Sequence, residues 1–162
     1  YNGKRTLDRI YLTPKDPKVP SEVTSALEAA DIIIVGPGDL YTTLLPVLIV
    51  PKIAQSFLAA KAKKIFVVNV ANKPFETKGY TVANFIHAVE KHLGTFPFHT
   101  VVTNNNYTVG IPKKYHYTYV KHTLEKTDTT SKTRVVEADL VNTTFPLYHD
   151  SEKLAKAIAT AV

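Results

Sequence analysis

The fold is decided by the stretch Ala30-Asp31-Ile32-Ile33-Ile34-Val35-Gly36-Pro37-Gly38-Asp39. Its centre is a run of four β-branched residues, 32–35, which is short and ends at a glycine. Such a run is typical of a strand that is buried on both faces of a parallel sheet. The glycine loop then follows the carboxyl end of this strand, which is where open parallel sheets bind their ligands.

Further strands and helices are predicted on both sides of this stretch. Helix-length segments of about 10–15 residues between strands indicate βαβ units, and their right-handed crossovers build a parallel sheet covered by helices. The sequence therefore predicts an α/β fold, a three-layer Rossmann-like domain with a mainly parallel sheet. The expected strands are residues 7–12, 32–35, 65–68, 100–103 and 134–138, and the expected helices are residues 21–29, 44–60, 82–93 and 151–161.

Local signals set the ends of these helices. Ser21, Thr81 and Asp150 are candidate N-caps, and Gly94 is a candidate C-cap. Pro51 is expected to kink or break the helix at 44–60, because proline removes a backbone donor. The segment 107–131 is polar, aromatic and irregular, although Tyr115, Tyr117 and Tyr119 alternate as in a strand. That alternation indicates a packed edge strand in preference to an aromatic platform for bases.

The bulk composition suits one globular domain over residues 1–162, with 44% hydrophobic and 21% charged residues. The absence of cysteine excludes disulfides, thiolate nucleophiles and Cys-ligated zinc. No apolar run approaches the roughly 18 residues of a membrane span, and residues 1–5 do not resemble a signal peptide. We therefore expect a cytoplasmic protein without a membrane partner. The chain starts at Tyr1 and lacks Met, so we expect the C-terminal portion of a longer chain.

The net charge of +6 raises the question of a nucleic-acid partner. The lysines are spread along the chain, and only three arginines are present. Because arginine is the preferred reader of bases and phosphates, solvated lysines explain the charge better than a nucleic-acid surface. A modest positive field also suits an anionic small ligand such as a nucleotide.

The glycine loop is the first candidate site. Gly36 and Gly38 lack Cβ atoms, so the backbone can turn sharply and approach a ligand, and Pro37 stiffens the turn. The loop leads into a helix N-terminus, where free N–H groups and the dipole favour an anion. Thr42 and Thr43 offer hydroxyl groups there, and Asp39 is a candidate for capping the helix, for a metal ion or for a ribose hydroxyl. A tight connection without a ligand explains the pattern equally well.

Two more strand ends are expected at the same edge of the sheet. Residues 69–79 form a longer polar loop than a connection requires, with Asn69, Lys73 and Thr77 as candidate contacts. Glu76 is the only plausible general base or metal carboxylate in it, although capping the next helix explains it as well. Asn104 ends the next strand, where consecutive asparagines also suit left-handed turns. His87 and His92 are five residues apart and do not form a metal pair on one helix face, and no Ser-His-Asp set can be argued.

These loops resemble those of the CofD-like family, which comprises 2-phospho-L-lactate transferases and gluconeogenesis factors. Residues 30–46 resemble the family pattern A-D-x-I-x-x-G-P-G-S-L-Y-T-S-x-x-P, and residues 69–81 resemble N-x-M-T-Q-P-G-E-T-x-G-F-T. Asn104-Asn105, residues 137–140 and residues 149–155 match the closing segments, so the resemblance covers nearly the whole chain. The form Gly-Pro-Gly-x-Leu-Tyr-Thr is nearer the gluconeogenesis-factor branch.

The resemblance implies a protein that binds a nucleotide or a nucleotide sugar and is linked to carbon metabolism and to the cell envelope and shape. The alternative is a transferase that moves a 2-phospholactate-like group from a nucleotide-activated donor to a deazaflavin-like acceptor, with a divalent metal ion such as Mg²⁺. Enzymatic activity and homo-oligomer formation stay open. Glu76 is the predicted catalytic residue, no metal ligand is assigned, and the predicted ligand contacts are Gly36, Pro37, Gly38, Asp39, Tyr41, Thr42, Thr43, Asn69, Lys73, Thr77 and Asn104.

The chain also departs from the family pattern. Asp39 stands in place of the usual Ser, Lys73 in place of Gln, and Phe75 in place of Gly. Asn72 and Val47 also replace the usual Thr and Asn. The family's glycine-rich Gly-Gly-Gly-Thr-Gly loop, which should cradle phosphates, does not occur in these 162 residues. The resemblance therefore predicts a ligand site without fixing the identity of the ligand.

Overall fold

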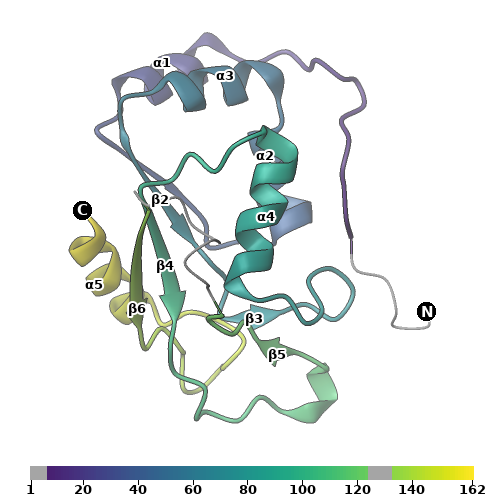
Figure 1. Cartoon of the computed structure of the whole chain (residues 1–162), viewed down its shortest axis with the longest axis vertical. Helices are drawn as coiled ribbons and strands as arrows, with labels where there is room; N and C mark the ends of the chain where they lie inside the picture. Colours follow the sequence, from purple (N-terminus) through teal and green to yellow (C-terminus); the bar gives the residue numbers. More distant parts are fainter. Residues whose placement is uncertain (1–6, 124–132) are drawn as a thin grey trace.

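A computed structural model describes residues 7–123 and 133–162 (Figure 1). Residues 124–131 of the segment expected to be irregular lie outside this description. The elements run in the order α1 (Ser21–Ala29), β1 (Ile32–Val35), the π-helix η1 (Leu40–Leu44), α2 (Leu45–Leu48), α3 (Pro51–Ala59), β2 (Lys63–Val67), β3 (Ala71–Asn72), α4 (Val82–Leu93), β4 (Thr100–Asn104), the 3₁₀ helix η2 (Lys113–Tyr115), β5 (Thr118–Tyr119), β6 (Arg134–Ala138) and α5 (Ser151–Ala161).

The main sheet has four strands in the order β1-β2-β4-β6, and every pairing is parallel. Val35 pairs with Phe66, and Asn104 pairs with Ala138, so all four strands end at one edge. The short strands β3 and β5 form a separate antiparallel pair. Figure 1 shows this small pair beyond the carboxyl edge of the main sheet. The predicted parallel α/β sheet is confirmed.

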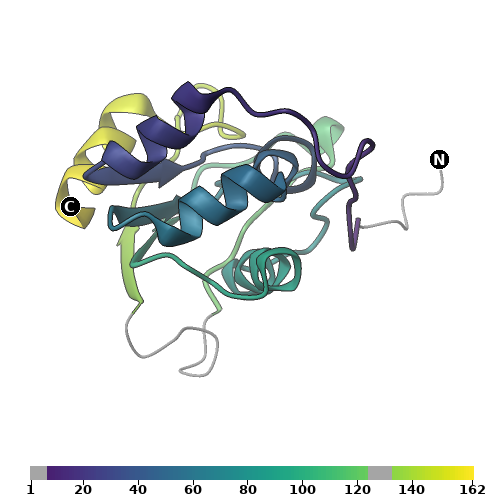
Figure 2. The ribbon, with the colours of Figure 1, turned by 90° about the horizontal axis from the view of Figure 1, so that it is seen from above.

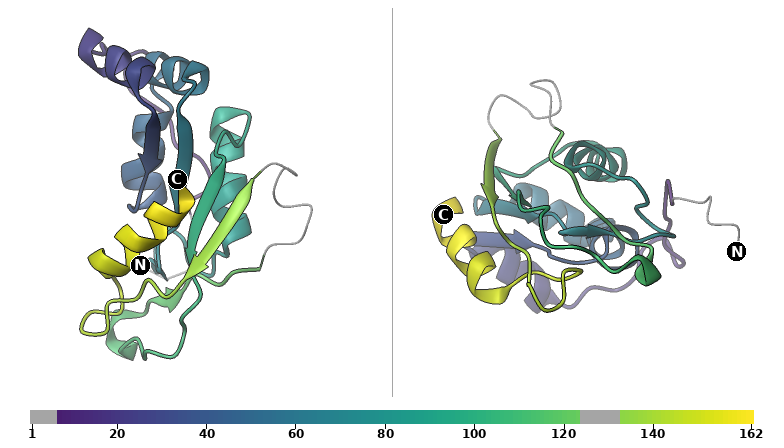
Figure 3. Two further views of the ribbon diagram at one scale, coloured as in Figure 1. Left: turned by 90° about the vertical axis from the view of Figure 1, so that its left-hand side faces the viewer. Right: turned by 90° about the horizontal axis from the view of Figure 1, so that it is seen from below.

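Helices cover the two faces of the sheet with separate cores. On one face, α2, α3 and α4 pack aromatic and aliphatic side chains such as Phe57 and Phe85 against Phe66 and Val101. On the other face, α5 packs Ala157 and Ala161 against Ile65 and Val102. Figure 2 and the left view of Figure 3 show α5 on the opposite side of the strands from α2 and α4. This is the expected three-layer arrangement.

The helix predictions hold closely at several ends. α4 starts after Thr81, whose backbone N–H donates to Asn84 Oδ1 at 2.9 Å, and it ends at Gly94 with φ +75°. α5 is capped by Asp150, whose carboxylate accepts hydrogen bonds from the backbone N–H groups of residues 152 and 153. The helix expected at 44–60 is broken as predicted, because Pro51 begins α3 at an angle of 76° to the preceding helical segment.

Four expectations are wrong. Ser21 is the first residue of α1 and not its cap, because the N-cap position is Pro20. The strand expected from the alternating tyrosines is reduced to β5, since Tyr115 lies in η2 and Tyr117 precedes the strand. The strand β1 is not buried on both faces, because it lies at the edge of the sheet and pairs only with β2 among the described residues. Ile32 and Ile34 are 39% and 44% exposed. Residues 7–12 are extended without forming a strand; Leu7 donates its backbone N–H to the Glu76 carbonyl, and Ile10 donates to His92 Nε2. These bonds attach the segment to loops and α4 instead of to a strand.

Within the described residues, no single helix is long and apolar enough to cross a membrane. The bent pair formed by residues 40–48 and 51–59 meets those criteria only when its two parts are counted together.

Candidate functional site

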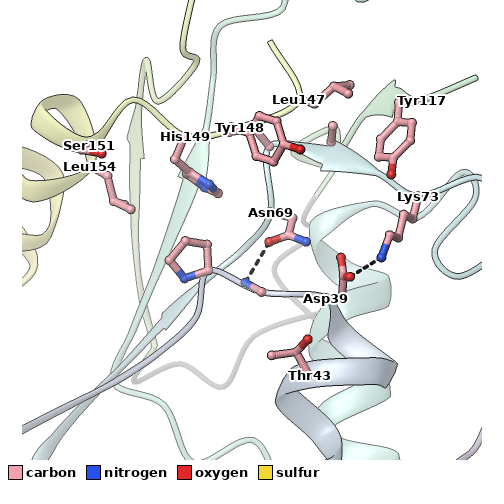
Figure 4. A pocket seen from close by; sticks show the side chains of 14 residues that line it. Asp39, Thr43, Asn69, Lys73, Tyr117, Leu147, Tyr148, His149, Ser151 and Leu154 are labelled. Carbon is pink, nitrogen blue, oxygen red and sulfur yellow. Dashed lines mark hydrogen bonds and ion pairs between the residues drawn. The ribbon is translucent and has the colours of Figure 1, made fainter. Parts of the chain in front are cut away.

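A cavity of about 570 Å³ lies at the carboxyl edge of the main sheet (Figure 4). Its walls come from the glycine loop after β1, the loop after β2 and the segment that leads into α5. Six predicted ligand residues line it: Pro37, Gly38, Asp39, Thr43, Asn69 and Lys73. The parallel topology thus brings two of the three predicted strand ends into one cavity, as expected for such sheets.

Gly36 fixes the path of the glycine loop. Its φ is +97°, a conformation that side chains with a Cβ rarely adopt. A Cβ at this position would stand 2.5 Å from the carbonyl oxygen of Val67 on the neighbouring strand. Gly38 then donates its backbone N–H to Asn69 Oδ1 at 3.1 Å. Glycine is therefore required where the first loop is held against the second.

Asp39 and Lys73 form an ion pair across the cavity, and Figure 4 shows the two side chains pointing at each other. Both side chains are partly exposed. The hydrogen bond to Asp39 raises the pKa of Lys73, so the ammonium stays charged. These are two of the positions at which the chain departs from the family pattern. The two departures are therefore in direct contact in the folded chain.

Glu76 is buried, and its carboxylate lies at the N-terminus of η1. Its Oε1 accepts the backbone N–H of Tyr41 at 2.7 Å and that of Thr42 at 3.1 Å. Two of the helix N–H groups that were expected to face a ligand anion are thus bonded to the protein's own carboxylate. Glu76 does not line the 570 Å³ cavity, and these bonds make it a residue that positions the glycine loop. Its predicted catalytic role stays a prediction.

Tyr41, Thr77 and Asn104 are predicted ligand residues that do not line this cavity. Tyr41 is buried, and burial together with its hydrogen bond to Tyr80 raises the pKa of its phenol. Thr77 is also buried, and its hydroxyl accepts the backbone N–H of Lys73 at 3.1 Å. The Asn104 side chain is buried, and its Oδ1 accepts the backbone N–H of Leu140 at 3.1 Å. These side chains brace the loops, and their contact with a ligand stays a prediction.

The structure adds cavity residues that the sequence analysis did not assign. Tyr117 comes from the segment before β5, and Tyr148, His149 and Ser151 lie at the start of α5. His149 Nε2 is 3.2 Å from the Val68 carbonyl oxygen, and burial lowers the pKa of its imidazole. One signal in the sequence could have identified the residues before α5. Asp150 was predicted to cap the last helix, and the residues just before this cap follow the last parallel strand, at the edge of the sheet where ligands bind.

These features define a Rossmann-like α/β protein with a cavity at the carboxyl edge of its parallel sheet. The sequence model of the family described as "2-phospho-L-lactate transferase CofD" matches residues 1–148. The chain therefore belongs to the CofD family.

Relatives within this family include gluconeogenesis factors. The chain is 40% identical over 103 residues to the gluconeogenesis factor of Bacillus subtilis, covering 64% of this chain and 32% of that protein. It is 26% identical over 156 residues to the gluconeogenesis factor of Listeria innocua, covering 94% of this chain and 48% of that protein.

Two crystal structures of one protein from Bacillus halodurans superpose on the chain with a TM-score of 0.83 at 27% identity. The match covers 96% of this chain and 51% of that protein. The chain thus spans from about a third to about half the length of the relatives described here.

Proposed function

We propose that the chain supplies one wall of a site for a nucleotide or nucleotide sugar in a protein of the gluconeogenesis-factor type. Ligand cavities for small molecules commonly measure about 300–1,000 Å³, and the cavity of about 570 Å³ falls in this range. Its lining combines one ammonium, one carboxylate and an amide with the rings of Tyr117 and Tyr148. This mixture suits a ligand that carries negative charge, hydroxyl groups and a planar ring.

The observation that carries the proposal is the ion pair of Lys73 and Asp39 inside the cavity. A simple anion would gain the attraction of the ammonium but also meet the repulsion of the neighbouring carboxylate. A ligand with both phosphate oxygens and hydroxyl donors satisfies the two groups together, because phosphate accepts from the ammonium and a hydroxyl donates to the carboxylate. Nucleotides and nucleotide sugars have both kinds of group.

The biological setting of the proposal follows from the relatives. Those from Bacillus subtilis and Listeria innocua are called gluconeogenesis factors. We propose that the protein acts in the cytoplasm, in carbon metabolism and in cell envelope and shape.

A titration of the full-length protein tests the proposal. Calorimetry should detect saturable binding of UDP-glucose or another nucleotide sugar, and much weaker binding of inorganic pyrophosphate, which lacks hydroxyl groups and a ring. A protein that gives no saturable heat with uridine, guanosine or adenosine diphosphate sugars would contradict the proposal. Equal affinity for pyrophosphate would contradict its central argument.

The description of the matching family model favours a second candidate, the transfer of a 2-phospholactate-like group to a deazaflavin-like acceptor. This candidate predicts turnover of a nucleotide-activated donor by the full-length protein in the presence of Mg²⁺. Nucleotide binding without group transfer, at every metal concentration tested, would contradict the transferase candidate and support the binding function.

A further inference from the structure

His149 is held in place at the rim of the cavity by its backbone. It pairs with Val141 in an isolated antiparallel bridge, and the next residue, Asp150, donates its backbone N–H to the Leu140 carbonyl at 2.8 Å. Asp150 also caps α5. The imidazole therefore extends from a backbone that is fixed on both sides, and it lines the cavity near Asn69 (Figure 4).

The single hydrogen bond of the ring determines which nitrogen carries the proton. Nε2 lies 3.2 Å from the Val68 carbonyl oxygen, and a carbonyl oxygen only accepts hydrogen bonds. Nε2 must therefore be the protonated nitrogen. Burial lowers the pKa of His149, which favours the neutral ring. In this tautomer Nδ1 is unprotonated, and it is a hydrogen-bond acceptor with no protein donor among the described residues.

Asn69 provides the complementary group. Its Oδ1 accepts the backbone N–H of Gly38, which sets the orientation of the amide and leaves the Nδ2 group as a donor. Within the described part of the chain, Nδ2 has no protein acceptor. The cavity thus presents one neutral acceptor on His149 and one neutral donor on Asn69, apart from the charged pair of Asp39 and Lys73.

We propose that His149 is a specificity-determining residue whose Nδ1 accepts a hydrogen bond from a neutral N–H or O–H group of the bound nucleotide or nucleotide sugar. The inference rests on the proposed function and extends it. A phosphate oxygen cannot make this bond because it is an acceptor, so His149 directs the phosphates towards Lys73. The base or the sugar of the ligand then faces His149, which orients the ligand in the cavity.

The test compares two substitutions in the full-length protein with UDP-glucose as the probe. His149→Gln keeps an amide that can donate to Val68 and an oxygen that can accept from the ligand. His149→Phe keeps a planar ring and removes both functions. Calorimetry should show an affinity close to that of the wild type for the Gln variant and a loss of about threefold to tenfold for the Phe variant, the effect of one neutral hydrogen bond.

Two further measurements separate recognition from a structural role. The Phe variant loses the bond to Val68, so thermal unfolding should show a lower midpoint; the Gln variant should match the wild type in both readouts. Nitrogen-15 NMR of the His149 ring should show an unprotonated Nδ1 in the free protein and a shift of that nitrogen on addition of UDP-glucose. A ring protonated on Nδ1, or a resonance that does not respond to saturating ligand, would overturn the inference.

The outcomes also distinguish this inference from the proposed function. A wild-type protein that binds no nucleotide sugar would overturn the proposed function. A wild type that binds while the Phe variant binds with unchanged affinity would overturn the role of His149 alone.

Discussion

Lys73 and Asp39 join the two loops that follow β1 and β2 by an ion pair inside the cavity. The pair lies beside the hydrogen bond from Gly38 to Asn69, which joins the same two loops. The Lys73 ammonium also lies 3.9 Å from Glu76 Oε2. Of these three charged groups, Lys73 and Asp39 line the cavity, so a ligand meets one cation and one carboxylate there.

Substitution of either partner should change the selectivity for anions. Lys73→Gln should weaken binding of UDP-glucose by about tenfold, because a charge-assisted hydrogen bond to phosphate is lost. Asp39→Ser should strengthen binding of pyrophosphate, because a repelling carboxylate is removed, and should weaken the preference for the nucleotide sugar. Calorimetry on the full-length protein measures both.

Lys91→Gln is the matched control, because Lys91 pairs with Asp8 away from the cavity. Its effect on either ligand should be small. Equal affinities for all three variants would show that the ion pair takes no part in recognition.

Gly36→Ala should destabilise the fold by about 2 kcal/mol or more, since it forces a side chain into a positive φ and against the Val67 carbonyl. Gly79→Ala is the control: its φ is +74°, and no heavy atom lies within 4 Å of the added Cβ, so about 1 kcal/mol is expected. Urea unfolding gives both values. Equal losses for the two variants would contradict the close approach of the glycine loop to β2.

Glu76→Gln should lower the free energy of unfolding by about 1–3 kcal/mol, because the charge that strengthens the bonds to the backbone of Tyr41 and Thr42 is removed. Glu28→Gln on the exposed surface of α1 should change it by less than about 0.5 kcal/mol. Chemical denaturation at neutral pH compares the two. Unchanged stability together with loss of a catalysed reaction would instead support the predicted catalytic role of Glu76.

The lowered pKa of His149 predicts a pH dependence of stability. The folded state holds the ring neutral below the unfolded pKa of 6.5, so the unfolded state binds the additional proton in that window. The free energy of unfolding should therefore fall as the pH falls below about 6.5 and stop changing from this source below the folded pKa.

His149→Gln should remove this contribution to the dependence of the unfolding free energy on pH. His116→Gln, at an exposed position, should retain it. Urea unfolding at a series of pH values from about 7.5 to 5 tests it. The same pH dependence in wild type and His149→Gln would contradict a neutral, partly buried imidazole.

The sequence predicted the elements whose determinants are local. The run at 32–35, the stop at Gly36, and the caps of α4 at Thr81 and Gly94 all depend on neighbouring residues, and the structure confirms them. The burial of β1 could not be read in this way. Whether a β-branched strand lies at the centre or at the edge of a sheet depends on the strand order, which places β1 outside β2.

The candidate site could be predicted only where its determinants are local in the sequence. The loops at 36–43 and 69–77 carry recognisable turn chemistry, and six of their predicted ligand residues line one cavity, while their contact with a ligand stays a prediction. The contact of Glu76 with Tyr41 spans 35 positions, and that of His149 with Val68 spans 81. Partners at such separations are set by how the loops pack, and single-residue patterns do not encode them.

The most direct test of the proposed nucleotide-sugar site is a crystal structure of the full-length protein with UDP-glucose bound. We predict ligand density in the cavity bounded by Gly38, Asn69, Lys73 and His149, with a phosphate oxygen at the Lys73 ammonium and a hydroxyl or ring N–H at His149 Nδ1. A ligand bound elsewhere, with this cavity filled only by solvent, would contradict the proposed site.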